Sequence, residues 1–220
     1  MVIPQAAIFQ NRRHAAHLLG ERLQDYSGTD SVVVAVPGGG IHVGFYMAQE
    51  LNLRLEVVPC KKIKHPADNN RTIGAVCRDA VVIREEDQKI PQDYIYHQIQ
   101  LLRHVIEGQI SKFYSGLEPP KLKNRTIILV DDLIRTGDTM LACLRTIKKQ
   151  EPDRIIVVVP AVTPEATRAI ASEMDEIIYL TIEPTIQSTG NLYEDFPNVP
   201  DEEVVSLLQM SRTQLKEQKN

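Results

Sequence analysis

Residues 32–40, Val32-Val-Val-Ala-Val-Pro-Gly-Gly-Gly40, indicate the fold of this chain. The first five are small or β-branched apolar residues without alternation, which is typical of a strand buried on both faces. The glycines end that strand, residues 41–51 then have the pattern of a helix, and a second short strand is expected at 55–59. Strand, helix and strand in this order predict parallel strands joined by a right-handed crossover.

The second half of the chain repeats this alternation of strands and helices. Apolar residues that recur every three or four positions predict an amphipathic helix over 93–115. Residues 61–71 are polar, basic and without period, so we expect a long loop there, followed by a short strand at 81–83. Further strands are expected at 126–132, 154–162 and 176–182, and further helices at 139–150, 164–174 and from 201 onward.

These elements add up to an α/β fold, with an open and mainly parallel sheet of about five strands flanked by helices. In such a sheet the ligand binds beyond the carboxyl ends of the strands. The length of 220 residues fits a single domain over 1–220, and the charged end, 211–220, is expected to fray.

The composition excludes several classes of protein. With 43% hydrophobic and 25% charged residues, the chain is neither disordered nor fibrous. Its net charge of −4 provides no basic field for nucleic acid or for an anionic membrane. We find no apolar run that could span a bilayer and no secretory signal, and we expect a cytoplasmic protein.

The chain contains three cysteines, Cys60, Cys77 and Cys143. Their odd number and long spacings favour neither a disulfide framework nor a zinc site. We expect them to be small, partly buried side chains.

Residues 127–139, Ile127-Ile-Leu-Val-Asp-Asp-Leu-Ile-Arg-Thr-Gly-Asp-Thr139, carry the clearest chemical pattern. A strand delivers Asp131 and Asp132 at its carboxyl end, and a turn containing Gly137 opens a helix. The unpaired N–H groups of that helix start suit a phosphate. Two adjacent carboxylates would repel a bare phosphate, but they accept hydrogen bonds from sugar hydroxyls or orient a hydrated Mg²⁺. Together these features predict a ribose 5-phosphate site, whereas the plainer alternative is that the carboxylates only cap the turn.

This segment resembles the 5-phosphoribosyl 1-diphosphate (PRPP) binding motif of type I phosphoribosyltransferases, with four apolar residues, Asp-Asp, two apolar residues and Thr-Gly-x-Thr. The resemblance covers about residues 5–210. Within this family, the chain is similar to a bacterial branch known as predicted phosphoribosyltransferases. It implies the type I phosphoribosyltransferase fold, with a small hood over the strand ends. Residues 183–200 are expected to form the hood, and the N-terminus is a further candidate for it. The segments that carry the likeness are 36–44, 62–63, 73–76, 193–196 and 201–204.

The resemblance also implies roles for individual residues. Asp131 and Asp132 would contact the ribose hydroxyls, and Lys61 or Lys62 would face the leaving group from a mobile flap over 61–74. Mg²⁺ is the implied cofactor, carried in with PRPP and held at most through water by the two aspartates. The implied catalytic residues are Asp131, Asp132 and Lys62; the 5-phosphate site is Arg135, Thr136, Gly137, Asp138 and Thr139; the diphosphate site is Gly38, Gly39, Gly40 and Lys61; and Tyr193 and Phe196 either stack on the base or pack the hood.

The implied reaction transfers the 5-phosphoribosyl group of PRPP to a nitrogenous base and releases diphosphate, as in nucleotide salvage. Related enzymes are often homodimers, and no nucleic acid or membrane partner is implied. Two positions depart from the pattern: Gly38 stands where the bacterial branch usually has Arg, and Arg135 stands where a small residue is usual. Because glycine cannot pair with a diphosphate through a side chain, two alternatives remain. These are a non-catalytic regulator that binds PRPP or a nucleotide, and a phosphoribosyl or nucleotide hydrolase.

Overall fold

The computed structural model describes residues 8–87, 89–117, 119–186 and 192–217. Its centre is a five-stranded sheet in the order β2-β1-β6-β7-β8, in which every neighbouring pair is parallel. The predicted α/β fold is confirmed, and the sheet is entirely rather than mainly parallel. The strands are β1 (Val32–Ala35), β2 (Arg54–Val57), β6 (Thr126–Val130), β7 (Arg154–Val162) and β8 (Glu176–Ile182).

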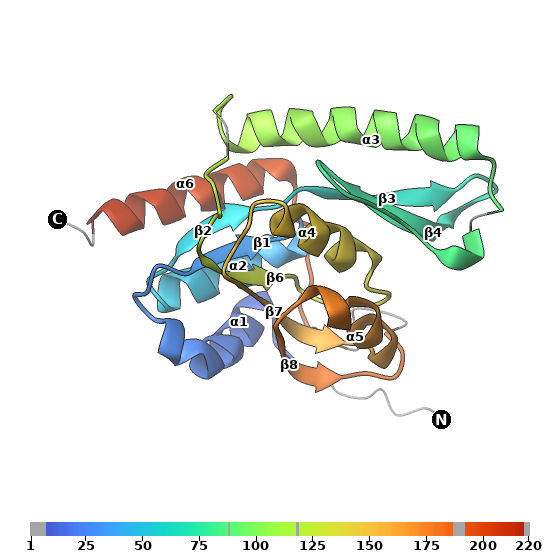
Figure 1. The fold of residues 1–220 in the computed structure, drawn as a ribbon. Helices are drawn as coiled ribbons and strands as arrows, with labels where there is room; N and C mark the ends of the chain where they lie inside the picture. The colour runs from blue at the N-terminus through green and yellow to red at the C-terminus, as the bar shows by residue number, and fades with distance from the viewer. Residues whose placement is uncertain (1–7, 88, 118, 187–191, 218–220) are drawn as a thin grey trace.

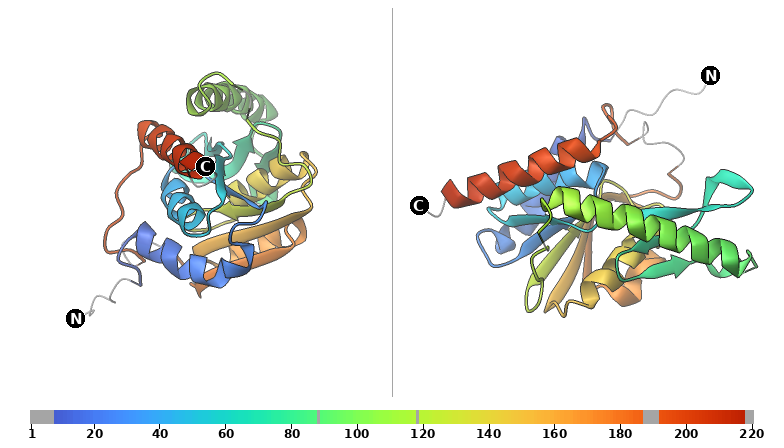
Figure 2. Two further views of the ribbon diagram at one scale, coloured as in Figure 1. Left: turned by 90° about the vertical axis from the view of Figure 1, so that its left-hand side faces the viewer. Right: turned by 90° about the horizontal axis from the view of Figure 1, so that it is seen from above.

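Helices cover both faces of this sheet, as Figures 1 and 2 show. Because side chains alternate along a strand, Val33 and Ala35 of β1 enter one hydrophobic core, while Val32 and Val34 enter the other. This double burial explains why the strands are continuous apolar runs in the sequence. The first face is covered by α1 (Arg12–Gly20), α2 (Gly39–Glu50) and α6 (Asp201–Glu217), and the second by α4 (Asp138–Lys148) and α5 (Pro164–Ile170).

A second sheet replaces the loop that we predicted over residues 61–71. Strands β3 (Cys60–His65) and β4 (Asp68–Cys77) form an antiparallel hairpin, and β5 (Val81–Ile83) extends it. The loop prediction is therefore wrong. The outer half of β4 is exposed and polar, so it lacks the alternation by which a half-buried strand is recognised.

The small sheet lies between two helices. Helix α3 (Gln92–Phe113) runs along it and confirms the amphipathic helix expected at 93–115 (Figure 1). On the other side the sheet packs against α4, which belongs to the second face of the central sheet. The hairpin is therefore attached to the element that follows the Asp-Asp motif.

The two ends of the described chain are both tied to the body. Near the N-terminus, Phe9 exchanges backbone hydrogen bonds with Leu192 and Glu194 of the segment that follows β8. At the other end, α6 continues to Glu217, within the segment 211–220 that we expect to fray, while residues 218–220 lie outside the described range. Within the described residues, no helix combines the length and the hydropathy that a bilayer crossing requires. Short 3₁₀ helices complete the fold at Glu21–Tyr26, Glu85–Asp87 and Ala171–Glu173.

Candidate functional site

Two loops meet at the carboxyl edge of the central sheet. Strands β1 and β6 are parallel neighbours, and the Val36 N–H donates to the Val130 carbonyl at 2.9 Å. The glycine loop and the two aspartates therefore leave the sheet side by side. A β-carbon at Gly39 would lie 1.5 Å from Asp132 Oδ2 and 2.6 Å from Arg12 Nε. Only a residue without a side chain allows the backbone to approach the aspartates so closely.

Two hydrogen bonds hold Asp132 in place, one to its carboxylate and one to its backbone carbonyl. Its Oδ2 accepts a hydrogen bond from Arg12 Nε at 2.9 Å, and Arg12 is only 6% exposed. The Arg12 guanidinium also lies over the Phe196 ring, 3.7 Å from its centroid. The Tyr193 hydroxyl donates to the backbone carbonyl of Asp132 at 2.8 Å. Helix α1 and the segment after β8 thus fix the orientation of this carboxylate.

Asp131 has a different environment. Its Oδ1 accepts a hydrogen bond from the Asp132 N–H at 2.8 Å. Burial and the neighbouring charge of Asp132 raise the pKa of Asp131 well above its usual range, while the positive charge of Lys62 opposes this rise. Hydroxyl donors or a hydrated cation beside this carboxylate would favour its ionised form. The pair of carboxylates therefore fits a Mg²⁺ held through water, as the chemistry of that ion requires.

The loop between Asp132 and α4 has the geometry of an anion site. Gly137 has a φ of 87°, in the left-handed region, and it directly precedes the helix. Its position is also crowded, since a β-carbon there would lie 3.1 Å from the Ala169 β-carbon. The first turn of α4 presents N–H groups without partners in the helix, at the positive end of the helix dipole. Backbone donors for a phosphate are thus placed at the edge where the aspartates emerge.

One oxygen of the Asp138 carboxylate is engaged within the protein. Its Oδ2 accepts hydrogen bonds from the Thr136 hydroxyl at 3.0 Å and from Arg84 at 2.9 Å and 2.6 Å. Arg84 directly follows β5, so the small sheet supplies a cation next to residues 135–139, the predicted phosphate loop. Burial lowers the pKa of Arg84, but the hydrogen bond to Asp138 and the negative charges of Asp138, Glu86 and Asp87 together raise it.

Sequence reasoning did not identify Arg12 or Arg84. Each is held by an aspartate that the motif did contain, at separations of 120 and 54 residues. The sequence signals were weak. Arg12 follows the helix cap Asn11, and Arg84 follows a predicted strand.

Of the predicted residues, Lys61, Arg135 and Tyr193 are placed differently from the others. Lys61 and Lys62 alternate along β3 and so point to opposite faces, and Lys62 is the one whose charge acts on Asp131. The side chain of Arg135 is exposed. Tyr193 is 1% exposed, with ring centroids of Phe9 and Phe196 at 5.4 Å and 4.9 Å. This geometry favours the packing interpretation of Tyr193 over stacking on a base.

Gly38 has a backbone that only glycine adopts readily. Its φ is 100° and its ψ is −136°. A side chain would find open space there, but the conformation itself would be strained. The Arg of the resembling bacterial branch would therefore require a different backbone at this position.

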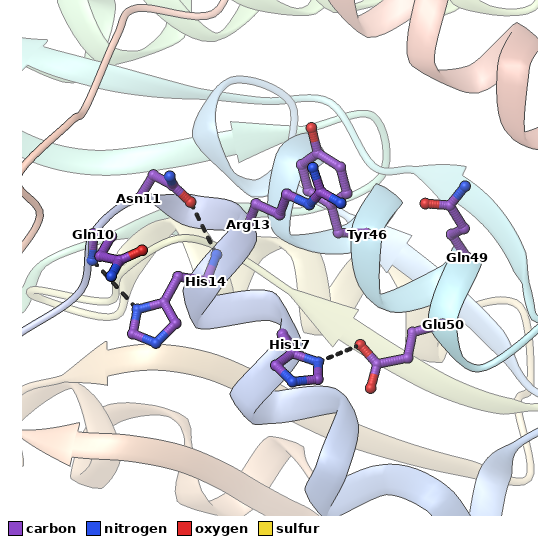
Figure 3. Close-up of a pocket in the computed structure, with 8 residues that line it drawn as sticks. All are labelled: Gln10, Asn11, Arg13, His14, His17, Tyr46, Gln49 and Glu50. Atoms are coloured by element: carbon purple, nitrogen blue, oxygen red, sulfur yellow. Dashed lines mark hydrogen bonds and ion pairs between the residues drawn. The ribbon is translucent and has the colours of Figure 1, made fainter.

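A surface depression of about 450 Å³ lies between α1 and α2, away from the predicted site residues (Figure 3). Figure 3 shows His17 directed at Glu50, 3.1 Å away, and Arg13 beside the Tyr46 ring. None of the predicted site residues lines this depression.

The comparison with family models decides the family. The phosphoribosyl transferase domain model matches residues 4–193. The chain belongs to the phosphoribosyl transferase family. Members with curated names include "Putative phosphoribosyl transferase Rv0571c" and its counterpart MT0597, from two strains of Mycobacterium tuberculosis. Each is 27% identical over 208 residues, which is 91% of this chain and 46% of theirs. The chain thus spans about half the length of the curated relatives it matches.

Solved structures of the phosphoribosyl transferase fold are also similar to this chain. The crystal structure of TT1426 from Thermus thermophilus is 29% identical, with a TM-score of 0.76 over 92% of this chain and 98% of that one. A purine phosphoribosyltransferase from Pyrococcus horikoshii is 16% identical, with a TM-score of 0.48 over 79% of this chain and 83% of that one.

Proposed function

We propose that this protein binds PRPP with Mg²⁺ and transfers its 5-phosphoribosyl group to a nitrogenous base, releasing diphosphate. The observation that carries the proposal is the close approach of Gly39 and Gly40 to Asp132 and Asp131, beside the start of α4. This arrangement puts backbone phosphate donors and two hydroxyl acceptors on one edge of the sheet. Membership of the family supports the same reaction class.

Each group has a task that its surroundings support. The ribose 2′- and 3′-hydroxyls donate to Asp131 and Asp132, and Arg12 keeps the second carboxylate oriented. The 5-phosphate binds the backbone of 135–139, with Arg84 as the nearby cation. Lys62, next to Asp131, stabilises the charge of the departing diphosphate. Bound with PRPP, Mg²⁺ supplies further neutralisation of that charge.

A non-catalytic PRPP-binding role is the second candidate, and Gly38 favours it. Without an Arg side chain, the loop offers the diphosphate only its N–H groups. Such a loop can hold the ligand without stabilising the charge that develops when diphosphate leaves.

Calorimetric titration with PRPP, with and without Mg²⁺, tests the site. We expect Mg²⁺-dependent binding that weakens by about 10- to 100-fold in Asp131→Asn, because hydrogen bonds to a charged group are lost. Asp153→Asn is the matched control, since Asp153 is an exposed carboxylate just before β7, at the opposite edge of the sheet. Equal affinity in wild type and Asp131→Asn would remove the proposed site.

Measurement of diphosphate release separates the remaining functions. Release that depends on an added base identifies a transferase, and screening purines, pyrimidines and other bases names the acceptor. Release without a base, with ribose 5-phosphate as the product, identifies a hydrolase. Tight binding without any release identifies the regulatory function.

A further inference from the structure

Three sulfur atoms converge where the small sheet packs against α4. The Sγ atoms of Cys60, Cys77 and Cys143 all lie within 4.8 Å of one another, and those of Cys77 and Cys143 are 3.6 Å apart. Cys60 and Cys77 are cross-strand partners at the base of the β3-β4 hairpin, and Cys143 reaches them from α4. Residues far apart in the sequence are therefore gathered by the packing of the small sheet against α4.

The spacing of the sulfurs matches that around a metal ion. Metal–sulfur bonds of about 2.3 Å in a tetrahedral arrangement separate the ligand atoms by about 3.8 Å. The three thiols are free, and a disulfide would use only two of them. Three sulfurs at mutual distances of this size are instead the donor set that a thiophilic ion requires.

The cluster is largely buried, and a cavity lies near the segments that carry it. Cys77 and Cys143 are completely buried, among aliphatic side chains of the second core. A cavity of about 480 Å³ lies next to all three segments that carry the cysteines. Its lining includes Val58 and Pro59 before Cys60, Arg78 and Asp79 after Cys77, and Thr146 one turn beyond Cys143.

We infer that Cys60, Cys77 and Cys143 form a three-thiolate site for a thiophilic metal ion, Cu⁺ or Zn²⁺. Sulfur ligands select these two ions over the harder Mg²⁺ that suits the aspartates. Three sulfurs satisfy Cu⁺, whereas Zn²⁺ would need a fourth ligand, such as one solvent molecule. Binding displaces thiol protons, so the affinity increases with pH.

An ion at this position joins two parts of the molecule. Cys60 Sγ lies 3.8 Å from the backbone carbonyl of Thr139, in the first turn of α4. The ion would fasten the base of the hairpin to that helix. We therefore expect the bound form to unfold at a higher temperature than the free protein.

Titration of the reduced full-length protein with Zn²⁺, and separately with Cu⁺, tests the site. The readouts are metal bound per chain, affinity against a chromophoric chelator, and the sulfur-to-metal absorption of a Co²⁺-loaded sample. We expect one ion per chain, and an affinity at least about 100-fold lower in Cys60→Ser. Cys60 is the least buried of the three, and melting curves check that this variant is folded.

The control variant removes two histidines elsewhere in the molecule. His14 and His17 line the depression between α1 and α2, and the double variant His14→Ala/His17→Ala should keep the full affinity. Retention of tight binding in Cys60→Ser would overturn the inference. So would loss of binding in the histidine variant, or failure of the wild type to bind either ion under reducing conditions. Tight binding of only one of the two ions supports the site and identifies its metal.

Discussion

Asp131 and Asp132 are chain neighbours with opposite contributions to stability. Asp132 is paired with a buried arginine, so its charge is compensated. Asp131 has a raised pKa because it is buried beside a like charge. Folding therefore favours the protonated form of Asp131, and its ionisation costs stability as the pH rises from about 4 through the raised pKa. The fold thus places Asp131 where its ionised form is unfavourable, which is typical of a functional group.

This difference predicts opposite effects of two similar substitutions at neutral pH. Asp131→Asn should stabilise the protein by about 1 kcal/mol, because it removes an unfavourable charge and keeps an acceptor for the Asp132 N–H. Asp132→Asn should destabilise it by about 3 kcal/mol, because Arg12 is left buried without its counter-charge. Urea unfolding of the two variants measures both values. A change of the same sign in both would contradict this account.

The raised pKa of Asp131 also predicts how PRPP affinity depends on pH. Only the ionised carboxylate accepts hydrogen bonds from both sugar hydroxyls. As the pH is lowered, the PRPP affinity should therefore begin to fall at a higher pH than it would with an ordinary aspartate. Asp132→Asn removes the like charge, lowers the pKa of Asp131 and shifts this loss to lower pH. Calorimetry from about pH 5 to about pH 8 measures the PRPP affinity of the wild type and of Asp132→Asn. The comparison cancels the ionisation of the ligand's own phosphates, and identical pH profiles would refute the role of Asp131.

At the scale of elements, the glycine loop depends on one position. A β-carbon at Gly39 would overlap the Asp132 carboxylate and Arg12. Gly39→Ala should therefore cost about 1–3 kcal/mol of stability and weaken PRPP binding. Gly108→Ala is the matched control, since Gly108 lies within α3 with open space around it and should gain about 1 kcal/mol. Thermal unfolding and PRPP titration of both variants decide the matter, and a neutral Gly39→Ala would show that the loop is not constrained.

The start of α4 depends in turn on the small sheet. Arg84→Ala removes the cation that Asp138 holds beside the phosphate loop, and it leaves the Asp138 carboxylate with the Thr136 hydroxyl but without its cationic partner. We expect about tenfold weaker binding of ribose 5-phosphate, since a hydrogen bond to a charged group is worth about 1.5–3 kcal/mol. Arg145→Ala is the control. Arg145 lies in the second half of the same helix, α4, and it pairs with Glu173. Equal affinities in the two variants would separate Arg84 from the phosphate site.

The sequence predicted elements with local signals and missed the contacts between them. The strands of the central sheet and the Asp-Asp motif were identified because apolar runs and adjacent turn residues are local features. The hairpin was missed because its outer residues are exposed, and no apolar alternation marks them. Which helix packs against which strand decides the contacts of Arg12, Arg84 and the three cysteines. The spacing of residues along the chain does not reveal this packing. Each was found only when tertiary structure brought distant residues within a few ångströms.

At the scale of the whole molecule, the net charge of the protein has the same sign as that of the proposed ligand. The chain carries a net charge of −4, so PRPP gains nothing from a general field. Local cations and backbone N–H donors must attract it instead, and they come from the small sheet and from α4. Arg84 follows the small sheet, Lys62 lies on its hairpin, and the N–H groups belong to α4. Binding should therefore draw the small sheet and the central sheet together.

Hydrogen exchange with and without PRPP and Mg²⁺ tests this coupling. In the free protein, the exposed outer half of the hairpin, with its irregular register after Ile63, should exchange faster than the buried residues 73–77. With ligand, exchange over 61–72 should slow because Lys62 is held at the diphosphate. The tail of α6 serves as an internal reference, since it lies outside the proposed site. Slowing confined to 131–139, with the hairpin unchanged, would mean that PRPP binds at the aspartates and α4 without engaging the small sheet.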